Sequence, residues 1–398
     1  MLDNEKHETD SMLLVCDFHP TLVSRILDVY RFFRNIPKII LIRRIFDGST
    51  ARFPTNSHLT VEAVTIPLPA PGVEQGRTLR NFTAVVSVIG YLLSIPFIYW
   101  KIQRRNTHVR LVHAHYLFPQ GLFGILLASL FRVPLILTAT GTDVNSTMRQ
   151  SLLGRVLIRL IIDRAFVTIA VSKPIEQYLR QEGITNCTYI PNSIDTSSIR
   201  PVEDNARGDT ILFAGRLIDS KRPLDLVRAF EIVVNRVPTA MLLLCGDGPM
   251  KAIVQEEIEK KNLQGKVKMY GFIGPSALNE VRSRASIFVL PSISEGLSLA
   301  LLEAMAAGQA VIASRNESNA SVLVNGESGL LYEPDNPTDL AAKILAAIED
   351  KQLRTRLSQS ARRVCQAEFS NEVAASLLES LYAKAGKVRD KDRFNIEQ

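Results

Sequence analysis

Short apolar runs alternate with helix-like stretches along the first half of the chain. Each run has the length of one buried strand, and each is followed by a turn and then by a stretch with helical periodicity. The predicted strands of this half are Met12–Cys16, Leu111–Ala114, Leu135–Ala139 and Phe166–Val171. Strands and helices that alternate in this way predict a parallel sheet covered by helices.

The second half repeats the alternation more regularly and predicts a complete doubly wound domain. Since a single core stops growing at about 250 to 300 residues, a chain of 398 residues is expected to form two such domains. We predict an α/β protein with domains over 1–200 and 206–369 and a helix at about 370–387 that can pack back on the first domain. The predicted strands of the second half are Thr210–Ala214, Ala240–Cys245, Lys266–Tyr270, Ile287–Leu290 and Ala310–Ala313.

One apolar segment, Phe82–Trp100, contains 19 residues without a charge and has basic residues on both sides. Its length reaches the threshold for a helix that spans a membrane. Gly90 and Pro96 interrupt the segment, and it falls inside a predicted strand–helix unit. A buried helix, or one that lies in a membrane interface, is therefore favoured over a spanning helix.

Composition places the chain among globular proteins, with 46% hydrophobic and 22% charged residues. The four cysteines are widely spaced and form no C-x-x-C pattern, which indicates reduced thiols and no metal held by cysteine. The polar, acidic N-terminus lacks the basic and apolar regions of a secretory signal. We therefore expect a cytoplasmic protein.

The net charge of +7 is concentrated in the first half of the chain. Residues 11–200 contain 21 Lys and Arg against 10 Asp and Glu, whereas residues 206–398 contain 25 against 24. No aromatic residues interleave with the basic ones as they do in nucleic-acid modules, so we expect no nucleic-acid partner. An anionic membrane surface is the favoured partner, contacted peripherally.

The strongest chemical signal is the segment Ser294–Ala313, which places Glu295 after a predicted strand and Glu303 eight positions later. Eight positions are a little over two helical turns, so the two carboxylates can bracket a ligand of nucleotide size. The open N–H groups at the start of the predicted helix, residues 296–299, suit a pyrophosphate, and a deeper carboxylate suits ribose hydroxyls. A capped amphipathic helix without a ligand would show the same pattern.

The second signal is the segment Leu212–Pro223. A predicted strand ends at Gly215, whose missing side chain lets a ligand approach the backbone. Arg216 and Lys221 follow on the loop at the carboxyl end of the predicted sheet. Two cations there would neutralise a leaving diphosphate, although either one alone could be a solvated surface residue.

Together these motifs resemble the retaining family 4 glycosyltransferases, also called glycosyl transferases group 1, which have the GT-B fold. The resemblance covers about residues 108–382 and implies two Rossmann-like domains that face each other across a cleft. Further segments similar to the family are Val112–Gly121, Thr138–Asn145, Ile190–Asp195, Gly246–Pro249 and Tyr270–Gly274.

The resemblance implies a role for each matching residue of the donor side. Arg216 and Lys221 would bind the distal phosphate of the donor. Glu303 would hydrogen-bond the ribose, and Glu295 would hydrogen-bond the hydroxyls of the transferred sugar. The remaining donor-binding residues that it implies are Gly215, Phe272, Ile273, Gly296 and Leu297, with the base beside Phe272 and Ile273.

On the acceptor side, the resemblance places His115 beside the anomeric carbon, with Gly141 and Asp143 nearby. The catalytic set that it implies is therefore His115, Glu295, Arg216 and Lys221. It further implies transfer from a UDP- or GDP-sugar to a glycan or lipid-linked acceptor with retention of configuration, in cell-surface polysaccharide synthesis. No metal and no other cofactor is expected.

The sequence departs from the family pattern at three places, and two alternatives to a transferase stay open. The loop at residues 17–25 lacks the usual glycines, Thr140 stands where many relatives have a histidine, and Ala310 stands where a proline is usual. One alternative is a GT-B sugar-nucleotide epimerase, which would need acid and base groups of its own. The other is a non-catalytic GT-B subunit of a glycan synthase complex.

Overall fold

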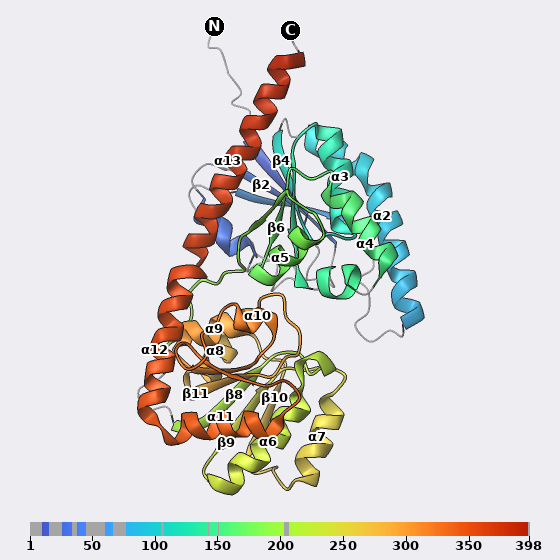
Figure 1. Cartoon of the computed structure of the whole chain (residues 1–398). Coiled ribbons are helices and arrows are strands. Elements are labelled where there is room, and N and C mark those ends of the chain that lie inside the picture. The colour runs from blue at the N-terminus through green and yellow to red at the C-terminus, as the bar shows by residue number, and fades with distance from the viewer. Residues whose placement is uncertain are drawn as a thin grey trace. The chain divides into compact units, whose positions relative to one another are not determined.

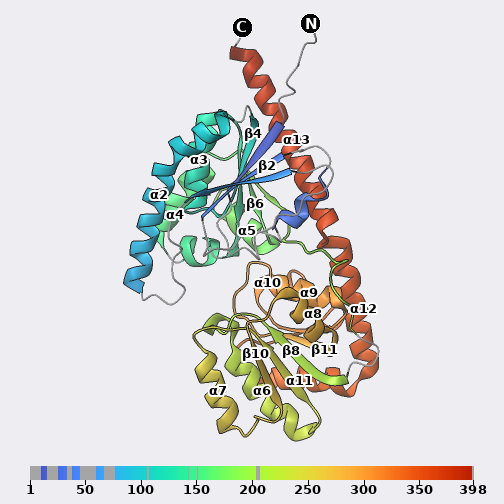
Figure 2. The same cartoon turned by 180° about the vertical axis from the view of Figure 1, so that it is seen from behind.

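The chain divides into two compact units, which we call unit 1 (residues 1–191 and 374–398) and unit 2 (residues 192–373). Each unit is built on one parallel sheet with helices on both faces (Figures 1 and 2). The α/β class predicted from the sequence is therefore confirmed. The computed structural model describes residues 10–15, 26–33, 38–44, 60–66, 77–104, 107–141, 143–149, 151–202 and 207–396.

The sheet of unit 1 has seven strands in the order β3-β2-β1-β4-β5-β6-β7, all parallel. The four strands predicted in this half are present as β1, β4, β5 and β6, although Cys16, the last residue of the first prediction, lies outside the described residues. The strands are β1 Asp10–Val15, β2 Lys38–Arg44, β3 Thr60–Ile66, β4 His108–His115, β5 Leu135–Ala139, β6 Val167–Ala170 and β7 Cys187–Tyr189.

The helices of unit 1 form two separate layers. Buried residues of α2 (Arg77–Gln103), α3 (Gln120–Phe131), α4 (Leu152–Ile162) and α5 (Lys173–Gln181) share one core with the sheet. The C-terminal helix α13 (Asn371–Ile396) packs into a second core on the opposite face. Figures 1 and 2 show α13 and α2 on opposite sides of the sheet.

The apolar segment noted in the sequence lies within α2. Among the helices that the structure describes, none combines the length and the apolarity needed to cross a membrane. The helix has buried residues such as Ile98 and Ile102 on one side, which pack into the core of unit 1. The interruption at Pro96 is accommodated inside the helix.

The sheet of unit 2 has six parallel strands in the order β10-β9-β8-β11-β12-β13. The five strands predicted for this half are all present, and the short edge strand β13 is an addition that the sequence pattern did not indicate. The strands are β8 Arg207–Ala214, β9 Met241–Cys245, β10 Val267–Gly271, β11 Ala285–Leu290, β12 Ala310–Ser314 and β13 Leu330–Tyr332.

Two hydrophobic cores lie on the two faces of this sheet. Buried residues of α6, α7 and α11 join one core, those of α8 and α9 join the other, and α12 contributes to both. Because all strands are parallel, the loops that follow their carboxyl ends gather at one edge. The helical segments are η2 Asp219–Lys221, α6 Pro223–Arg236, α7 Lys251–Lys260, α8 Pro275–Ser283, α9 Leu299–Ala307, α10 Glu317–Ala320, α11 Pro337–Glu349 and α12 Lys351–Glu368.

Candidate active site

Three strand-exit loops of unit 2 are joined by backbone hydrogen bonds. The N–H of Gly215, after β8, donates to the carbonyl of Cys245 at 2.9 Å, and the N–H of Leu217 donates to the carbonyl of Asp247 at 2.9 Å. The next loop is joined in turn, because the N–H of Gly246 donates to the carbonyl of Gly271 at 2.8 Å. The backbone at the carboxyl ends of β8, β9 and β10 is thus hydrogen-bonded from each strand end to the next.

The Gly-Asp-Gly sequence after β9 allows this close approach. Gly246 and Gly248 have φ values of +148° and +154°, which residues with a side chain rarely adopt. A Cβ at Gly246 would lie 1.8 Å from the carbonyl oxygen of Gly215, and one at Gly248 would lie 2.5 Å from that of Leu217. Both glycines are therefore needed for the two loops to pack together.

Lys221 and Glu295, the central residues of the two sequence motifs, form an ion pair. Their side chains are only 18% and 11% exposed, so solvent screens this pair less than a surface pair. The loops that carry them are also joined by the backbone, because the N–H of Ile293 donates to the carbonyl of Ser220 at 3.0 Å. The structure thus brings together residues that lie far apart in the sequence.

The start of α9 is held by side chains that bond to its carbonyls. Asn192 Nδ2 donates to the carbonyl of Leu297 at 3.2 Å, and Ser318 Oγ donates to that of Gly296. Ser298 caps the helix by accepting from the N–H of Leu301. Among the described residues, no acceptor is found for the N–H groups of Gly296 and Leu297. These two donors, at the positive end of a helix, suit an anion.

Glu303, on α9, forms a buried ion pair with Arg282 of α8. The exposed fractions of the two side chains are 7% and 2%, and Arg282 also donates from Nη1 to Asn279 Oδ1 at 2.5 Å. The guanidinium therefore fixes the orientation of the carboxylate. Sequence reasoning missed Arg282, because a single arginine in an exposed-looking helix carries no sign that it is buried.

Other predicted donor-side residues lie on the loops that follow β8 and β10. Arg216 is exposed, and among the described residues it has no ion-pair partner. Phe272, after β10, is 73% exposed, whereas Ile273 is partly buried against the core shared with α9. The predicted contacts of these residues with a phosphate and a base stay predictions.

In unit 1, His115 lies at the end of β4, where its ring stacks on that of His113 with centroids 4.4 Å apart. Burial lowers the pKa of His115 to about 4, so its imidazole is neutral at pH 7. The Nε2 atom is buried, and among the described residues it has no hydrogen-bond partner. This nitrogen is thus a buried polar atom whose hydrogen-bonding capacity is not used within the described residues.

His113 is engaged in a different way, within a buried network that reaches the C-terminal helix. Its Nδ1 lies 2.6 Å from the hydroxyl of Tyr382 on α13, and its Nε2 lies 2.8 Å from Thr138 Oγ1. Burial, and the neighbouring His115, lower the pKa of His113. Within the described part of the chain, no three His, Cys, Asp or Glu residues are grouped so that they could hold a metal.

Asp143 is buried in unit 1 at the start of a π-helical turn that follows Gly141. It accepts hydrogen bonds from the N–H and the hydroxyl of Thr140, at 3.1 and 3.0 Å. Burial raises the pKa of this carboxyl to about 7, and the hydrogen bonds it accepts only partly offset that effect. The glycine-poor loop at residues 17–25, noted in the sequence, lies outside the described residues.

Two units, each a parallel β-sheet covered by helices, are the architecture of the GT-B glycosyltransferases. Solved glycosyltransferase structures share this fold. A sucrose-phosphate synthase from Thermosynechococcus elongatus matches with a TM-score of 0.74 and 21% identity, over 94% of this chain and 98% of its own. The Anabaena protein HepE, in complex with UDP, matches with a TM-score of 0.71 and 17% identity, over 94% and 100%.

Sequence comparison places the chain more narrowly. The profile of the family "Glycosyl transferases group 1" matches residues 196–364, and that of "Glycosyltransferase Family 4" matches residues 63–198. An uncharacterized glycosyltransferase from Methanocaldococcus jannaschii is 30% identical over 267 residues, which cover 66% of this chain and 71% of that protein. The N-acetyl-alpha-D-glucosaminyl L-malate synthase of Bacillus anthracis is 26% identical over 293 residues, or 70% and 75%. The chain therefore belongs to the group 1 glycosyltransferases of family 4, as its motifs predicted.

Proposed function

We propose that this glycosyltransferase moves a hexose from a UDP- or GDP-sugar to a glycan or lipid-linked acceptor. The observation that carries the proposal is the ion pair of Lys221 and Glu295 beside the open N–H groups of Gly296 and Leu297. A cation and two N–H donors suit a diphosphate, and the adjoining carboxylate suits sugar hydroxyls. UDP in the similar HepE structure supports a nucleotide donor.

The leaving nucleoside diphosphate gains negative charge as the bond to the sugar breaks. Lys221, Arg216 and the start of α9 are the groups assigned to stabilise that charge. Removing one preorganised donor of this kind costs about 3 to 4 kcal/mol of activation free energy. Glu303, held by Arg282, is assigned to the ribose, because a buried and fixed carboxylate accepts hydrogen bonds from two neighbouring hydroxyls.

We assign retention of anomeric configuration, with the acceptor attacking from the face that the diphosphate leaves. Such a path requires no carboxylate nucleophile. The neutral imidazole of His115 is assigned to the transferred sugar, where its Nε2 can hydrogen-bond without adding positive charge to an oxocarbenium-like centre. The cations of unit 2 are assigned the neutralisation of the diphosphate, so the reaction is proposed to be independent of metal.

The proposed acceptor belongs to cell-surface polysaccharide synthesis, and the proposed location is peripheral at the inner face of the membrane. Two observations support this part: the excess of basic residues in the first half of the chain and the uncharged stretch Phe82–Trp100.

The decisive experiment is a donor screen by thermal shift, followed by product analysis. A nucleotide sugar that binds will raise the apparent stability by about 2.7 kcal/mol at a hundred times its Kd. Incubation of that donor with candidate acceptors should then give a product whose anomeric proton coupling matches that of the donor. Inverted coupling would overturn retention, and activity lost on chelation of metals would overturn metal independence.

Product analysis and calorimetry on the same protein distinguish the transferase from two alternatives. A GT-B epimerase would convert the nucleotide sugar without any acceptor, which product analysis detects directly. A non-catalytic subunit would show no heat of binding with either UDP or GDP in calorimetry. Binding together with acceptor-dependent release of the nucleoside diphosphate supports the transferase.

A further inference from the structure

Helix α2 is apolar on two opposite sides. Ile98 and Ile102 are buried at 0% and 1% exposure, and with the partly buried Ile95 they occupy positions i, i+3 and i+7 that face the core of unit 1. That row accounts for the packing of the helix against its own unit. It leaves the opposite side to be explained.

The opposite side presents a row of large apolar residues to solvent, which we call the outer row. Ile89, Leu93, Phe97 and Trp100 follow one another at intervals of four, four and three residues, so they lie along one helical face. Their exposed fractions are 50%, 76%, 47% and 49%. Apolar side chains grouped in this way mark a surface that contacts a partner.

Cations lie at the C-terminal end of the outer row. Lys101 Nζ lies 5.5 Å from the centroid of Phe97, and Arg104 Cζ lies 4.2 Å from that of Trp100. The two rings are themselves stacked at 6.3 Å. The whole helix, residues 77–103, contains no acidic residue. The partner therefore combines an apolar layer with negative charge beside it.

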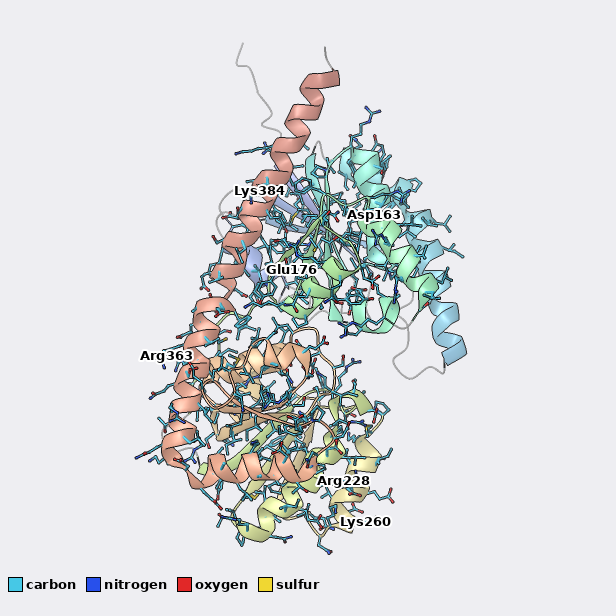
Figure 3. All side chains as sticks on the ribbon, viewed as in Figure 1. Asp163, Glu176, Arg228, Lys260, Arg363 and Lys384 are labelled. Atoms are coloured by element: carbon cyan, nitrogen blue, oxygen red, sulfur yellow. The ribbon has the colours of Figure 1, made fainter. Side chains whose placement is uncertain are left out.

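Helix α4 presents similar residues on the same side of the sheet (Figures 1 and 2). Leu152 and Leu153 are 78% and 80% exposed, and Val156 and Leu160 are at least half exposed. Both arginines of α4 have acidic partners, because Arg155 lies 3.7 Å from Glu182 and Arg159 lies 3.9 Å from Asp163, the residue labelled in Figure 3. The outer row of α2, by contrast, is flanked by Lys101 and Arg104, and the helix contains no acidic residue.

We propose that the outer row of α2 docks unit 1 on an anionic lipid bilayer. Leu93, Phe97 and Trp100 enter the boundary between headgroups and acyl chains, where tryptophan is favoured, and Lys101 and Arg104 contact lipid phosphates. This inference deepens the proposed peripheral location and is independent of the donor site in unit 2.

The chain contains a single tryptophan, so Trp100 reports directly on the outer row. The full chain is titrated with vesicles of phosphatidylcholine alone and of phosphatidylcholine with phosphatidylglycerol. We expect a blue shift of the emission and protection from acrylamide quenching with the anionic vesicles, and a much weaker effect with the neutral ones. Unchanged emission with both kinds of vesicle would overturn the proposal.

Charged substitutions in the outer row supply the matched comparison. The double variant Leu93→Glu/Phe97→Glu keeps Trp100 and should bind anionic vesicles at least about tenfold more weakly, because two apolar side chains no longer enter the bilayer and two negative charges face its surface. Ile232→Glu/Ile253→Glu, on α6 and α7 of unit 2 at 39% and 51% exposure, introduces the same two charges at exposed apolar residues and should bind normally. Equal binding by both variants would contradict docking through α2.

Two controls keep the result unambiguous. If Leu93→Glu/Phe97→Glu does not fold, Lys101→Glu/Arg104→Glu replaces it and should abolish the preference for anionic vesicles. A blue shift that grows with protein concentration without lipid, together with a dimer in sedimentation, would assign the row to a second copy and overturn the lipid proposal. The variant Lys221→Ala should lose donor binding but keep vesicle binding, so failure of one proposal is distinguishable from failure of the other.

Discussion

Lys221 is held against Glu295 with little exposure to solvent, so it is positioned before any diphosphate arrives. We expect Lys221→Ala to lower kcat/KM by about a hundredfold to a thousandfold, the loss typical of one preorganised charge-stabilising group. Steady-state kinetics with the donor found in the screen measures it. Lys260→Ala, at an exposed lysine of α7 (Figure 3), is the control and should be unchanged. An unchanged kcat/KM in Lys221→Ala would contradict a role of Lys221 in stabilising the diphosphate.

Arg282 and Glu303 form a buried ion pair, so replacing either side chain alone should destabilise the protein. Arg282→Leu should destabilise the protein by about 3 to 5 kcal/mol, because it leaves a buried carboxylate without its partner. Urea unfolding followed by circular dichroism measures the loss. The double variant Arg282→Leu/Glu303→Leu should recover much of it, since no buried charge then remains. A double variant as unstable as the single one would contradict this account.

Asp143 makes the stability of unit 1 depend on pH. Folding raises its pKa to about 7, so the folded protein retains a proton that the unfolded chain releases above about pH 4. The wild type should therefore lose stability relative to Asp143→Asn as the pH rises from 4 to 7, and the difference should level off above 7. The lowered pKa values of the buried His113 and His115 make the protein more stable as the pH rises. This contribution is the same in the wild type and in Asp143→Asn, so it does not affect the difference between them. A difference that does not vary with pH would refute the raised pKa.

At the scale of elements, α13 is the last helix of the chain yet completes a core formed by the first strands. Tyr382, Leu378 and Ala385 are buried with residues of β1 and β2. Ending the chain at residue 373 should expose this core, and we expect aggregation and strong binding of an apolar dye. Ending it at residue 387 keeps these three residues and should leave folding intact, as size-exclusion chromatography would show.

The whole molecule carries its charge unevenly, with the basic excess in residues 11–200. If that excess helps to hold unit 1 on an anionic bilayer, vesicle binding should weaken as salt rises, because the screening length falls from about 10 Å at 0.1 M to about 3 Å at 1 M. Sedimentation with anionic vesicles across this range measures the effect. Salt-independent binding would mean that only the apolar residues of α2 contribute.

Most of the fold could be predicted from the sequence, because buried parallel strands are continuous apolar runs. The five strands predicted in the second half are all present. In the first half, β2 and β3 were missed: Lys38, Arg43 and Arg44 flank the apolar centre of β2, and β3 alternates polar and apolar residues toward the edge of the sheet. The short β7 and β13 have only three residues each, too few for a periodic signal.

The sequence by itself determined the family and the residues of its two motifs in unit 2, since short spacings such as that from Glu295 to Glu303 are set within one loop and one helix. Only the tertiary structure decided which residues meet. The pairing of Lys221 with Glu295, of Glu303 with Arg282 and of His113 with Tyr382 joins positions far apart in the chain. Such contacts depend on how parallel strands and their helices pack, and burial, which shifts the pKa of Asp143 and His115, exists only once that packing has formed.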